Sequence, residues 1–439
     1  MEEVQEPVIA HYRGRLSEFK EEKKALLVGV FDQKSSKEIC HDHLDELENL
    51  CDTYGIEVID RMCSPLRTIE SATYIGSGKT QEIAHVCKEK RLNIVIFDEE
   101  ISAHQQRNLE KIFGVIVIDR TELILGVFEK RAHTKEAKIQ IELAQLRYQL
   151  PRLKRMWTHL SRQRTGGGSG GHLKGEGEKQ IEIDKRLVKR RIHRLEDLLE
   201  NVKKNRQVQR SQRQKSQIPT FAIVGYTNAG KSTLLNALTD AGVLVEDKLF
   251  ATLDTTTRKY TLPNSQQVLL IDTVGFIRKI PHLLVAAFTS TMEEATEADI
   301  LIHLVDIADP EAEDKIKASH KVLEELKALD KPTIMCLNKI DLLETNQPLM
   351  KLRLQFPFTV ALSATTQEGF DQLTEQMVKM ITLLRKQVSL KIPQSEYALV
   401  SEIMKKGQVL KLDYEGNDVF IEAQIPQEME YKLSKYLIS

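Results

Sequence analysis

A phosphate-binding loop is the clearest chemical signal in the sequence. Residues 225–232 have the sequence GYTNAGKS, which fits the pattern GxxxxGK[ST], and stand between an apolar run, 220–224, and a helical stretch, 233–239. In that strand–loop–helix context, the loop amides and the helix N-terminus cradle phosphate oxygens. We therefore expect the Lys231 ammonium on the β- and γ-phosphates and the Ser232 hydroxyl on Mg²⁺.

A second motif bears on the choice of base. NKID, residues 338–341, follows the apolar run 333–337 and so lies at the end of a predicted strand. A carboxylate there can accept hydrogen bonds from the N1–H and the exocyclic amine of guanine together, whereas adenine offers no such pair of donors. Asp341 is the expected acceptor. Asn338 would contact the base edge or tether the phosphate loop, and the stem of Lys339 would cover the ring.

A third apolar run, 358–362, ends in Ser363 and Ala364, which can offer a backbone N–H to the guanine O6. The NKxD pattern is short and weak alone. In this order and at this distance behind a phosphate loop, it predicts a guanine nucleotide.

Two segments could respond to the third phosphate. DTVG, residues 272–275, follows the predicted strand 268–271, where Asp272 would bind Mg²⁺ through water and the Gly275 amide would contact the γ-phosphate. Residues 249–258, LFATLDTTTR, contain several threonines, one of which must close over the nucleotide. We expect these two segments to be ordered by the γ-phosphate and released on hydrolysis.

Phe276 directly follows DTVG, at the position where a GTPase that orients water with glutamine would have Gln. A phenyl ring can neither orient water nor accept a proton. We therefore expect slow hydrolysis by the isolated chain, with a catalytic group or switch ordering supplied from outside.

Charge is unevenly distributed along the chain. Residues 131–216 contain 23 Lys and Arg against 9 Asp and Glu, a net charge of +14 in a chain whose net charge is −1. Such a block usually faces a polyanion, although a pair of solvated charged helices would have the same composition.

The basic segment is predicted to be a helical hairpin. Apolar residues recur every three or four positions and predict helices over 134–160 and 178–212, joined by residues 165–179, which contain seven glycines. A flexible linker is the alternative to a functional glycine-rich tip. The expected apolar seam includes Ile139, Leu143, Leu146, Ile183, Leu195 and Leu198; Arg152, Lys154, Arg155, Arg162 and Arg164 lead into the tip, and Trp157 and His159 could stack on an unpaired base.

The remaining pattern predicts α/β architecture with several domains. Predicted strands at 25–31, 56–62, 93–97 and 115–118 alternate with helices at 39–54, 80–91 and 103–113, which favours a mainly parallel sheet. The string GSGKT at 76–80 lacks the first glycine of a phosphate loop, where Thr73 stands, and predicts a turn and helix start. The tail predicts a small α+β module with strands at 389–392, 409–414 and 419–423 and helices at 396–406 and 427–436.

These elements predict four domains: an N-terminal α/β domain, 1–130; the basic helical hairpin, 131–216; a P-loop GTPase domain, 217–387; and a small α+β domain, 388–439. A chain of 439 residues has room for them.

No apolar run reaches the ~18 residues of a membrane span, and the start lacks the apolar stretch of a secretory signal. Five scattered cysteines favour a reducing compartment.

The ordered motifs at 225–232, Thr252, 272–275, 338–341 and 363–364 resemble those of the translation-factor class of GTPases. Beyond that domain, QQRNLE, DRTELIL, RAHTKEAKIQIELAQLRYQLPRL, the glycine-rich string and FATLDTTTR with DTVGFI resemble the HflX family over nearly the whole chain. The resemblance implies a cytoplasmic GTPase that associates with the large ribosomal subunit and its rRNA. It also implies weak ATP hydrolysis in some members and, in some, splitting of stalled ribosomes under stress.

The resemblance also assigns roles to single residues. Thr252 aligns with the threonine of the first switch, and Asn228 resembles the asparagine with which related GTPases hold K⁺. Thr255 stands where the family usually has proline, and His172, Leu173 and Lys174 replace a more arginine-rich string, so switch ordering and tip contacts could differ.

The candidate site residues follow from these motifs and this resemblance. The catalytic candidates are Lys231, Gly275 and Thr252, and the Mg²⁺ candidates are Ser232, Thr252 and, through water, Asp272. The candidates for binding GTP or GDP are Gly225, Tyr226, Thr227, Asn228, Ala229, Gly230, Lys231, Ser232, Thr233, Phe250, Thr252, Asp272, Gly275, Asn338, Lys339, Asp341, Ser363 and Ala364.

The leading hypothesis is a monomeric, GTP-gated factor that binds ribosomal RNA through residues 131–216 and splits or rescues stalled ribosomes. A GTPase of ribosome assembly or RNA modification would share this nucleotide chemistry. A nucleotide-dependent scaffold that regulates a protease or membrane partner through residues 1–125 is the non-enzymatic alternative.

Overall fold

The computed structural model describes residues 22–32, 36–152, 173–216, 218–239, 249–250, 252–253, 255–279, 292, 294–426, 429 and 432–438. Contacts divide the chain into two compact units. Unit 1 contains residues 1–204, 246–254 and 278–291, and unit 2 contains residues 205–245, 255–277 and 292–439. The segments 246–254 and 278–291 therefore belong to unit 1 although they interrupt unit 2 in sequence.

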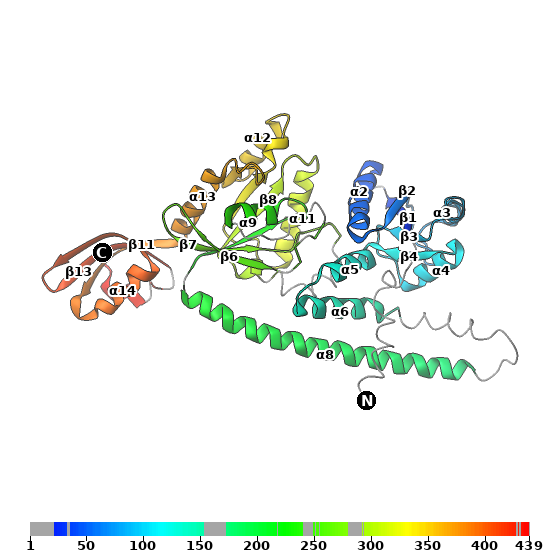
Figure 1. The fold of residues 1–439 in the computed structure, drawn as a ribbon, viewed down its shortest axis with the longest axis horizontal. Coiled ribbons are helices and arrows are strands. Elements are labelled where there is room, and N and C mark those ends of the chain that lie inside the picture. Colours follow the sequence, from blue (N-terminus) through cyan, green and yellow to red (C-terminus); the bar gives the residue numbers. More distant parts are fainter. Residues whose placement is uncertain are drawn as a thin grey trace. The chain divides into compact units, whose positions relative to one another are not determined.

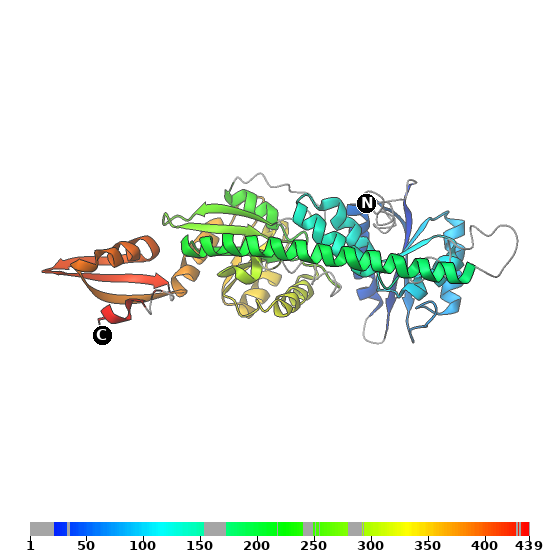
Figure 2. The same ribbon diagram turned by 90° about the horizontal axis from the view of Figure 1, so that it is seen from below.

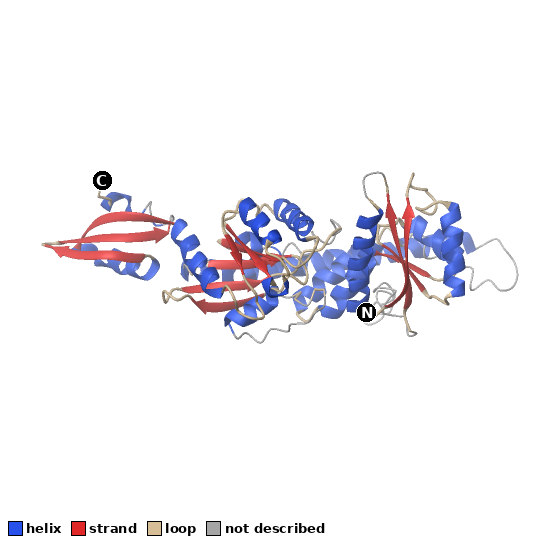
Figure 3. Cartoon of the chain, turned by 90° about the horizontal axis from the view of Figure 1, so that it is seen from above, coloured by secondary structure: helices blue, strands red, loops and turns tan. Residues whose placement is uncertain are grey.

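Unit 1 contains a four-stranded parallel sheet in the order β2-β1-β3-β4. Helices cover both faces of this sheet (Figures 1 and 3), with α2 and α5 in contact on one side and α3 and α4 on the other. The predicted parallel α/β fold is confirmed. Its elements are β1 (Lys24–Phe31), α2 (Lys37–Tyr54), β2 (Glu57–Pro65), α3 (Ser77–Glu89), β3 (Ile94–Phe97), α4 (Ala103–Phe113), β4 (Ile116–Asp119) and α5 (Arg120–Arg131).

Strands β3 and β4 read as apolar runs because both faces of the sheet are covered; every residue of β3 is buried. Helix α4 begins at a capping box, in which the Ser102 hydroxyl accepts from the Gln105 N–H and the Gln105 side chain accepts from the Ser102 N–H. The string 76–80 is the start of α3, as predicted, with Gly76 at the N-cap.

Two helices of the basic segment pack through a narrow apolar seam. Helix α6 (Lys135–Gln149) places Ile139, Leu143 and Leu146 against Val188 and Leu195 of α8 (Leu173–Ser216), the long helix in Figure 2. Ion pairs flank the seam: Arg191 binds both oxygens of Glu142, at 2.8 and 3.0 Å, and Arg147 donates to Glu196 at 2.6 Å.

Three expectations for the hairpin were wrong in detail. Helix α6 ends at Gln149 and not beyond it, because Pro151 has no N–H with which to continue the helical hydrogen bonds; Leu150, at the C-cap, still has helical dihedrals. Ile183 and Leu198, which helical spacing placed in the seam, are exposed. Val188, which was not predicted to lie in the seam, is buried in it. The predicted glycine-rich tip, 165–179, was too long, because residues 173–179 form the start of α8. Residues 165–172, Trp157, His159 and the cations from Lys154 to Arg164 lie outside the described residues.

Unit 2 contains a six-stranded sheet in the order β10-β9-β8-β5-β7-β6, in which only the β6–β7 pair is antiparallel. Its buried side chains come from the strands and from the helices that cover them. The elements are β5 (Thr220–Gly225), α9 (Lys231–Thr239), β6 (Thr256–Thr261), β7 (Gln267–Asp272), β8 (Ile300–Asp306), α11 (Ala312–Glu325), β9 (Thr333–Asn338), η1 (Ile340–Leu342), α12 (Gln347–Gln355), β10 (Thr359–Ala361) and α13 (Phe370–Leu383).

The tail forms a separate antiparallel sheet in the order β11-β13-β12 with its own apolar core. It consists of β11 (Arg385–Pro393), η2 (Gln394–Glu396), α14 (Tyr397–Lys406), β12 (Gln408–Glu415), β13 (Asp418–Pro426) and η3 (Ser434–Tyr436). Of the predicted helix 427–436, residues 427, 428, 430 and 431 lie outside the described residues, and 434–436 form the 3₁₀ turn η3. Across the described part of the chain, no helix is long and apolar enough to span a bilayer.

His303 of β8 is a buried histidine at the centre of unit 2. Neither ring nitrogen has a hydrogen-bond partner among the described residues, and its ring lies 5.4 Å from that of His320. Burial, with the His320 charge adding to it, lowers the pKa of His303 to about 3. The folded protein therefore keeps this ring neutral where the unfolded chain takes up a proton.

We expect His303→Leu to reduce the sensitivity of the protein to acid. Below the ordinary histidine pKa the unfolded chain binds a proton that the folded protein does not, so stability falls as pH falls. From about pH 8 to about pH 5.5, His303 should lower the free energy of unfolding by roughly 1.4 kcal/mol, and His303→Leu should remove this loss. Urea denaturation at both pH values measures it. Ser319→Ala, a buried non-titrating change in α11, is the control; an unchanged pH difference in His303→Leu would contradict the assignment.

Candidate nucleotide-binding site

The loop between β5 and α9 can be turned only with glycine at two positions. Gly225 has a φ of +149° and a Cβ there would lie 2.2 Å from the Leu304 carbonyl oxygen. Gly230 has a φ of +94°, and its Cβ would lie 2.4 Å from the side-chain amide nitrogen of Asn338. These close approaches bring the loop amides round to the start of α9, which is the geometry of an anion-binding nest.

Lys231, the first residue of α9, is buried beneath this loop. Its ammonium donates a hydrogen bond to the Tyr226 carbonyl oxygen at 2.7 Å. Burial lowers the pKa of Lys231 to about 8, and the Asp272 charge opposes that shift only in part. An anion bound in the loop would favour the charged form, so the residue fits a phosphate ligand.

Thr227 has a buried polar group that could bind a ligand. Its hydroxyl is buried and has no hydrogen-bond partner within the described ranges. Its N–H donates to the Phe276 carbonyl oxygen at 2.8 Å, and the Phe276 N–H donates to the Gly225 carbonyl oxygen at 3.0 Å. These two bonds fasten the segment after β7 to the phosphate loop.

Ser232 and Asp272 meet beside Lys231. The Ser232 hydroxyl donates to an Asp272 carboxylate oxygen at 2.7 Å, and Asp272 is fully buried at the end of β7. Strand β7 pairs with β5, which places Asp272 next to Ile223 in the register. The pair offers the hard oxygen ligands that Mg²⁺ prefers.

Gly275 lies against Thr227 and Lys231. A Cβ at Gly275 would come within 2.8 Å of Thr227 Cγ2 and 2.9 Å of Lys231 Nζ. The adjacent Phe276 side chain is 2 % exposed, so the ring is part of the core and does not line a water site. The backbone of residue 275 is therefore the group that can approach a terminal phosphate.

Asn338 joins three segments of the site. Its amide nitrogen donates to the Ala229 carbonyl oxygen at 2.8 Å, and its amide oxygen accepts from the Ala364 N–H at 2.9 Å. The sequence left two roles open for Asn338, contact with the base edge or tethering of the phosphate loop. In the structure, Asn338 tethers the phosphate loop to the loop after β10.

The other residues of the NKID motif are more exposed. Lys339 has a φ of +67° and its ammonium lies 2.7 Å from Asp306 at the end of β8. Asp341 is an exposed residue of η1. Ser363 is buried, and its hydroxyl accepts from the Thr366 N–H at 3.1 Å. Asp306 was not among the candidates, although its place after an apolar strand could have indicated it.

Phe250 and Thr252 belong to unit 1, so their predicted contacts with nucleotide stay predictions. The Phe250 ring packs edge-on against Phe128 of α5, with 4.5 Å between ring centroids. Sequence reasoning did not find Phe128, because nothing local marks a partner so far along the chain.

The parallel sheet, the glycine-turned loop with its buried lysine, and the Asn338 tether define the class of the protein as a P-loop GTPase. Comparisons with known proteins agree. Residues 41–129 match the family described as GTP-binding GTPase N-terminal, residues 131–213 match GTP-binding GTPase Middle Region, and residues 220–339 match 50S ribosome-binding GTPase.

Curated relatives cover nearly the whole chain. It is 48% identical over 416 residues to GTPase HflX of Chlamydia pneumoniae, covering 94% of this chain and 88% of that protein. It is 42% identical over 420 residues to GTPase HflX of Caldanaerobacter subterraneus, covering 96% and 95%. A GTP-binding protein of Sulfolobus solfataricus, crystallised with GDP, is 27% identical, with 82% of this chain and 99% of that chain covered and a TM-score of 0.43.

The chain belongs to the HflX family of GTPases. It binds guanine nucleotide and hydrolyses GTP, as the predicted enzyme class requires.

We expect Asn338→Ala to weaken GTP and GDP binding together, because both loops that it joins lose a hydrogen bond. The loss of the two hydrogen bonds, to the Ala229 carbonyl and from the Ala364 N–H, corresponds to about 1–3 kcal/mol, or roughly a 5- to 150-fold rise in Kd. Titration with a fluorescent guanine nucleotide measures it. The exposed Asn346→Ala should bind as the wild type does; an unchanged Kd in Asn338→Ala would show that the tether is dispensable.

Proposed function

We propose that the protein is a GTP-gated factor that docks onto the large ribosomal subunit through residues 131–216 and separates or rescues stalled ribosomes. The observation that carries this proposal is the combination of a guanine-nucleotide site with a long helix whose outer face is basic. Membership of a family whose GTPase domain is described as 50S ribosome-binding supports the choice of partner.

The cations of α8 are divided between two faces. Arg191, on the seam side, is held by Glu142 of α6. On the other side, four cations recur at helical spacing and are exposed: Arg186, Lys189, Arg190 and Arg194. An arrangement that served only to hold two helices together would not need this outer row, whereas RNA phosphates would neutralise it.

At the nucleotide, we assign Lys231 to the β- and γ-phosphates and the Gly275 amide to the γ-phosphate. Ser232, Thr252 and, through water, Asp272 would hold Mg²⁺, which neutralises charge on the phosphates when bound. Asp341 would accept from the guanine edge, the Lys339 stem would cover the ring, and the 363–364 backbone would face O6. K⁺ at Asn228 is a further candidate.

Slow hydrolysis by the isolated chain follows from the burial of Phe276. With that ring in the core, the Phe276 side chain does not position an attacking water. Lys231 and the loop amides supply charge stabilisation only. The missing group, or the ordering of the segments that carry Thr252 and Gly275, would be supplied by the ribosome.

We expect ribosomes to stimulate GTP turnover by roughly 10³–10⁵-fold, the range that a catalytic group supplied in trans contributes. Phosphate release under single-turnover conditions, with and without purified ribosomes, measures the ratio. Equal turnover with and without ribosomes would contradict the proposal that the ribosome supplies the missing catalytic group or orders the switch segments.

We expect neutralising the outer row, Arg186→Gln, Lys189→Gln, Arg190→Gln and Arg194→Gln together, to weaken docking and to flatten its salt dependence. If each cation meets one phosphate, the slope of log affinity against log salt should fall by about 3. Sedimentation with large subunits between about 50 and 200 mM salt tests this.

The matched control neutralises four exposed cations of unit 2, Lys317, Lys321, Lys379 and Lys391. It should leave the slope as in the wild type. A wild-type affinity that does not change with salt would remove the RNA-binding role from α8. Binding confined to immature particles would favour a role in assembly over one in splitting.

A further inference from the structure

Two aspartates lie at the same edge of the unit 1 sheet. Strands β3 and β4 are parallel neighbours, with Phe97 opposite Asp119 in the register, and Asp98 follows Phe97 directly. Because parallel strands end at one edge, the two carboxylates are neighbours although they serve different parts of the chain. Both are buried, with Asp98 2 % and Asp119 0 % exposed.

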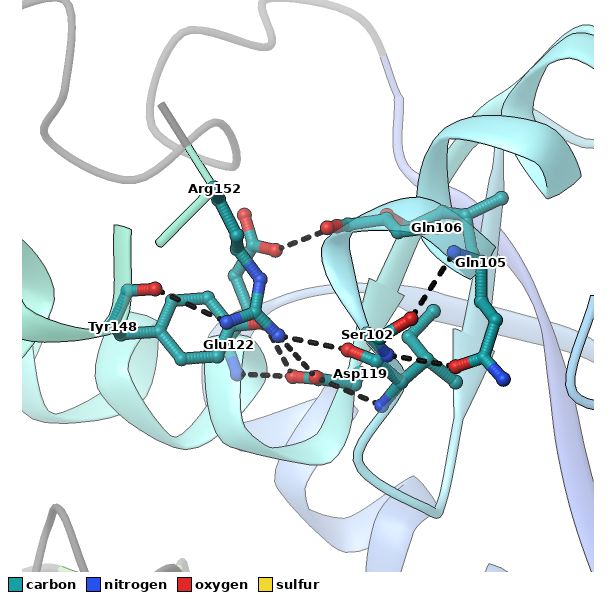
Figure 4. Close-up of polar contacts among 9 residues, drawn as sticks. Ser102, Gln105, Gln106, Asp119, Glu122, Tyr148 and Arg152 are labelled. Carbon is teal, nitrogen blue, oxygen red and sulfur yellow. Dashed lines mark hydrogen bonds and ion pairs between the residues drawn. The ribbon is translucent and has the colours of Figure 1, made fainter. Parts of the chain in front are cut away.

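Asp119 holds the end of α6, the helix that leads into the basic segment. Its carboxylate accepts from the Tyr148 hydroxyl at 2.8 Å, from the Arg152 guanidinium at 3.3 Å and from the Glu122 N–H at 2.9 Å (Figure 4). Arg152 also donates to the Ile101 carbonyl oxygen at 2.9 Å, and its guanidinium lies 3.6 Å above the Tyr148 ring. The chain that continues to the tip therefore starts from a fixed point on the sheet edge.

Asp98 holds a segment that follows the γ-phosphate motif. Its carboxylate pairs with the Lys279 ammonium, which also pairs with Glu99. Lys279 stands four positions after Gly275, and it belongs to unit 1 by its contacts. The two nearby cations, Arg120 and Lys279, keep the pKa of Asp98 below its usual value although burial opposes them.

Arg120 connects the two aspartates. It directly follows Asp119 in the chain, and its guanidinium donates to Asp98 at 2.7 Å and also pairs with Glu46 of α2. A shift of β4 that moves Asp119 must therefore also move Arg120 and change the field at Asp98. Removing one partner of a buried ion pair leaves an uncompensated buried charge, so the groups that Arg120 joins resist being separated.

The other switch segment is held by the same domain. The Leu249 N–H donates to the Thr53 hydroxyl of α2 at 3.2 Å, and Phe250 packs on Phe128 of α5. Phe250 precedes Thr252 by two positions. The N-terminal α/β domain thus contacts the flank of each segment that the nucleotide is expected to order.

We propose that this sheet edge, Asp98–Arg120–Asp119, is a coupling element between the base of the basic segment and the two switch segments. Asp98, Asp119 and Lys279 are positioning residues: they act through Thr252 and the 275 backbone and touch no nucleotide themselves. The inference rests on the proposed function for its physiological ligand, ribosomal RNA. Coupling is reciprocal, so the nucleotide must change RNA docking by the same factor by which docking changes nucleotide affinity.

The test uses the full chain and two mild substitutions. Lys279→Gln removes the ion pairs with Asp98 and Glu99, and Tyr148→Phe removes one hydrogen bond to Asp119 while keeping the ring. Lys259→Gln, an exposed change in β6, is the control. For each protein and for the double variant, the affinity for purified large subunits is measured with a non-hydrolysable GTP analogue and with GDP.

We expect the ratio of the two affinities to lie within about 5–150 for the wild type and to fall at least fivefold in Lys279→Gln. The two substitutions should be non-additive, because they break one network. A ratio that stays within twofold of the wild type in Lys279→Gln overturns the coupling. A wild type that does not bind subunits, or binds them equally with both nucleotides, overturns the proposed function instead.

Hydrogen exchange without ribosomes keeps the coupling testable in that second case. Replacing GDP by the GTP analogue should change the protection of 94–119 and of 135–149 in the wild type and in Lys259→Gln, and not in Lys279→Gln. Protection that is the same with both nucleotides in the wild type would overturn the coupling whatever the ribosome does.

Discussion

The buried ammonium of Lys231 is the interaction on which the nucleotide site depends. Burial makes its charge costly, and the loop above it offers it one carbonyl oxygen, from Tyr226. A bound phosphate would stabilise the buried charge by pairing with it, so the site suits an anion. The close approaches at Gly225 and Gly230 and the Asn338 tether all serve to keep the loop in the shape that accepts it.

The parts of this site that sequence could predict are those that depend on residue type alone. Glycine at 225 and 230, lysine at 231 and the NKID string follow from local geometry and chemistry. The choice between two roles for Asn338, the pairing of Lys339 with Asp306, and the contacts of Asp98 and Phe250 depend on residues far apart in the chain. Pro151 could have predicted the end of α6, but the apolar spacing continues past it and led to a prediction of a longer helix.

Helix α8 shows how one element can serve two purposes. Its inner face is committed to α6 through an apolar seam and the Arg191–Glu142 pair, and its outer cations are left to solvent or to a partner. Among the α8 side chains that the structure describes, the fully buried apolar ones in the seam are Val188 and Leu195, whereas Ile183 and Leu198, which spacing had placed there, are exposed. Charge, rather than apolar area, is what the outer face offers.

The account as a whole claims that the γ-phosphate controls docking on ribosomal RNA. Co-sedimentation of the wild-type chain with purified large subunits, in the presence of GTP, GDP or a non-hydrolysable GTP analogue, tests that claim most directly. We predict tight binding with the analogue, weak binding with GDP, and with GTP a level that declines as it is hydrolysed. Equal binding in all three states would contradict the claim.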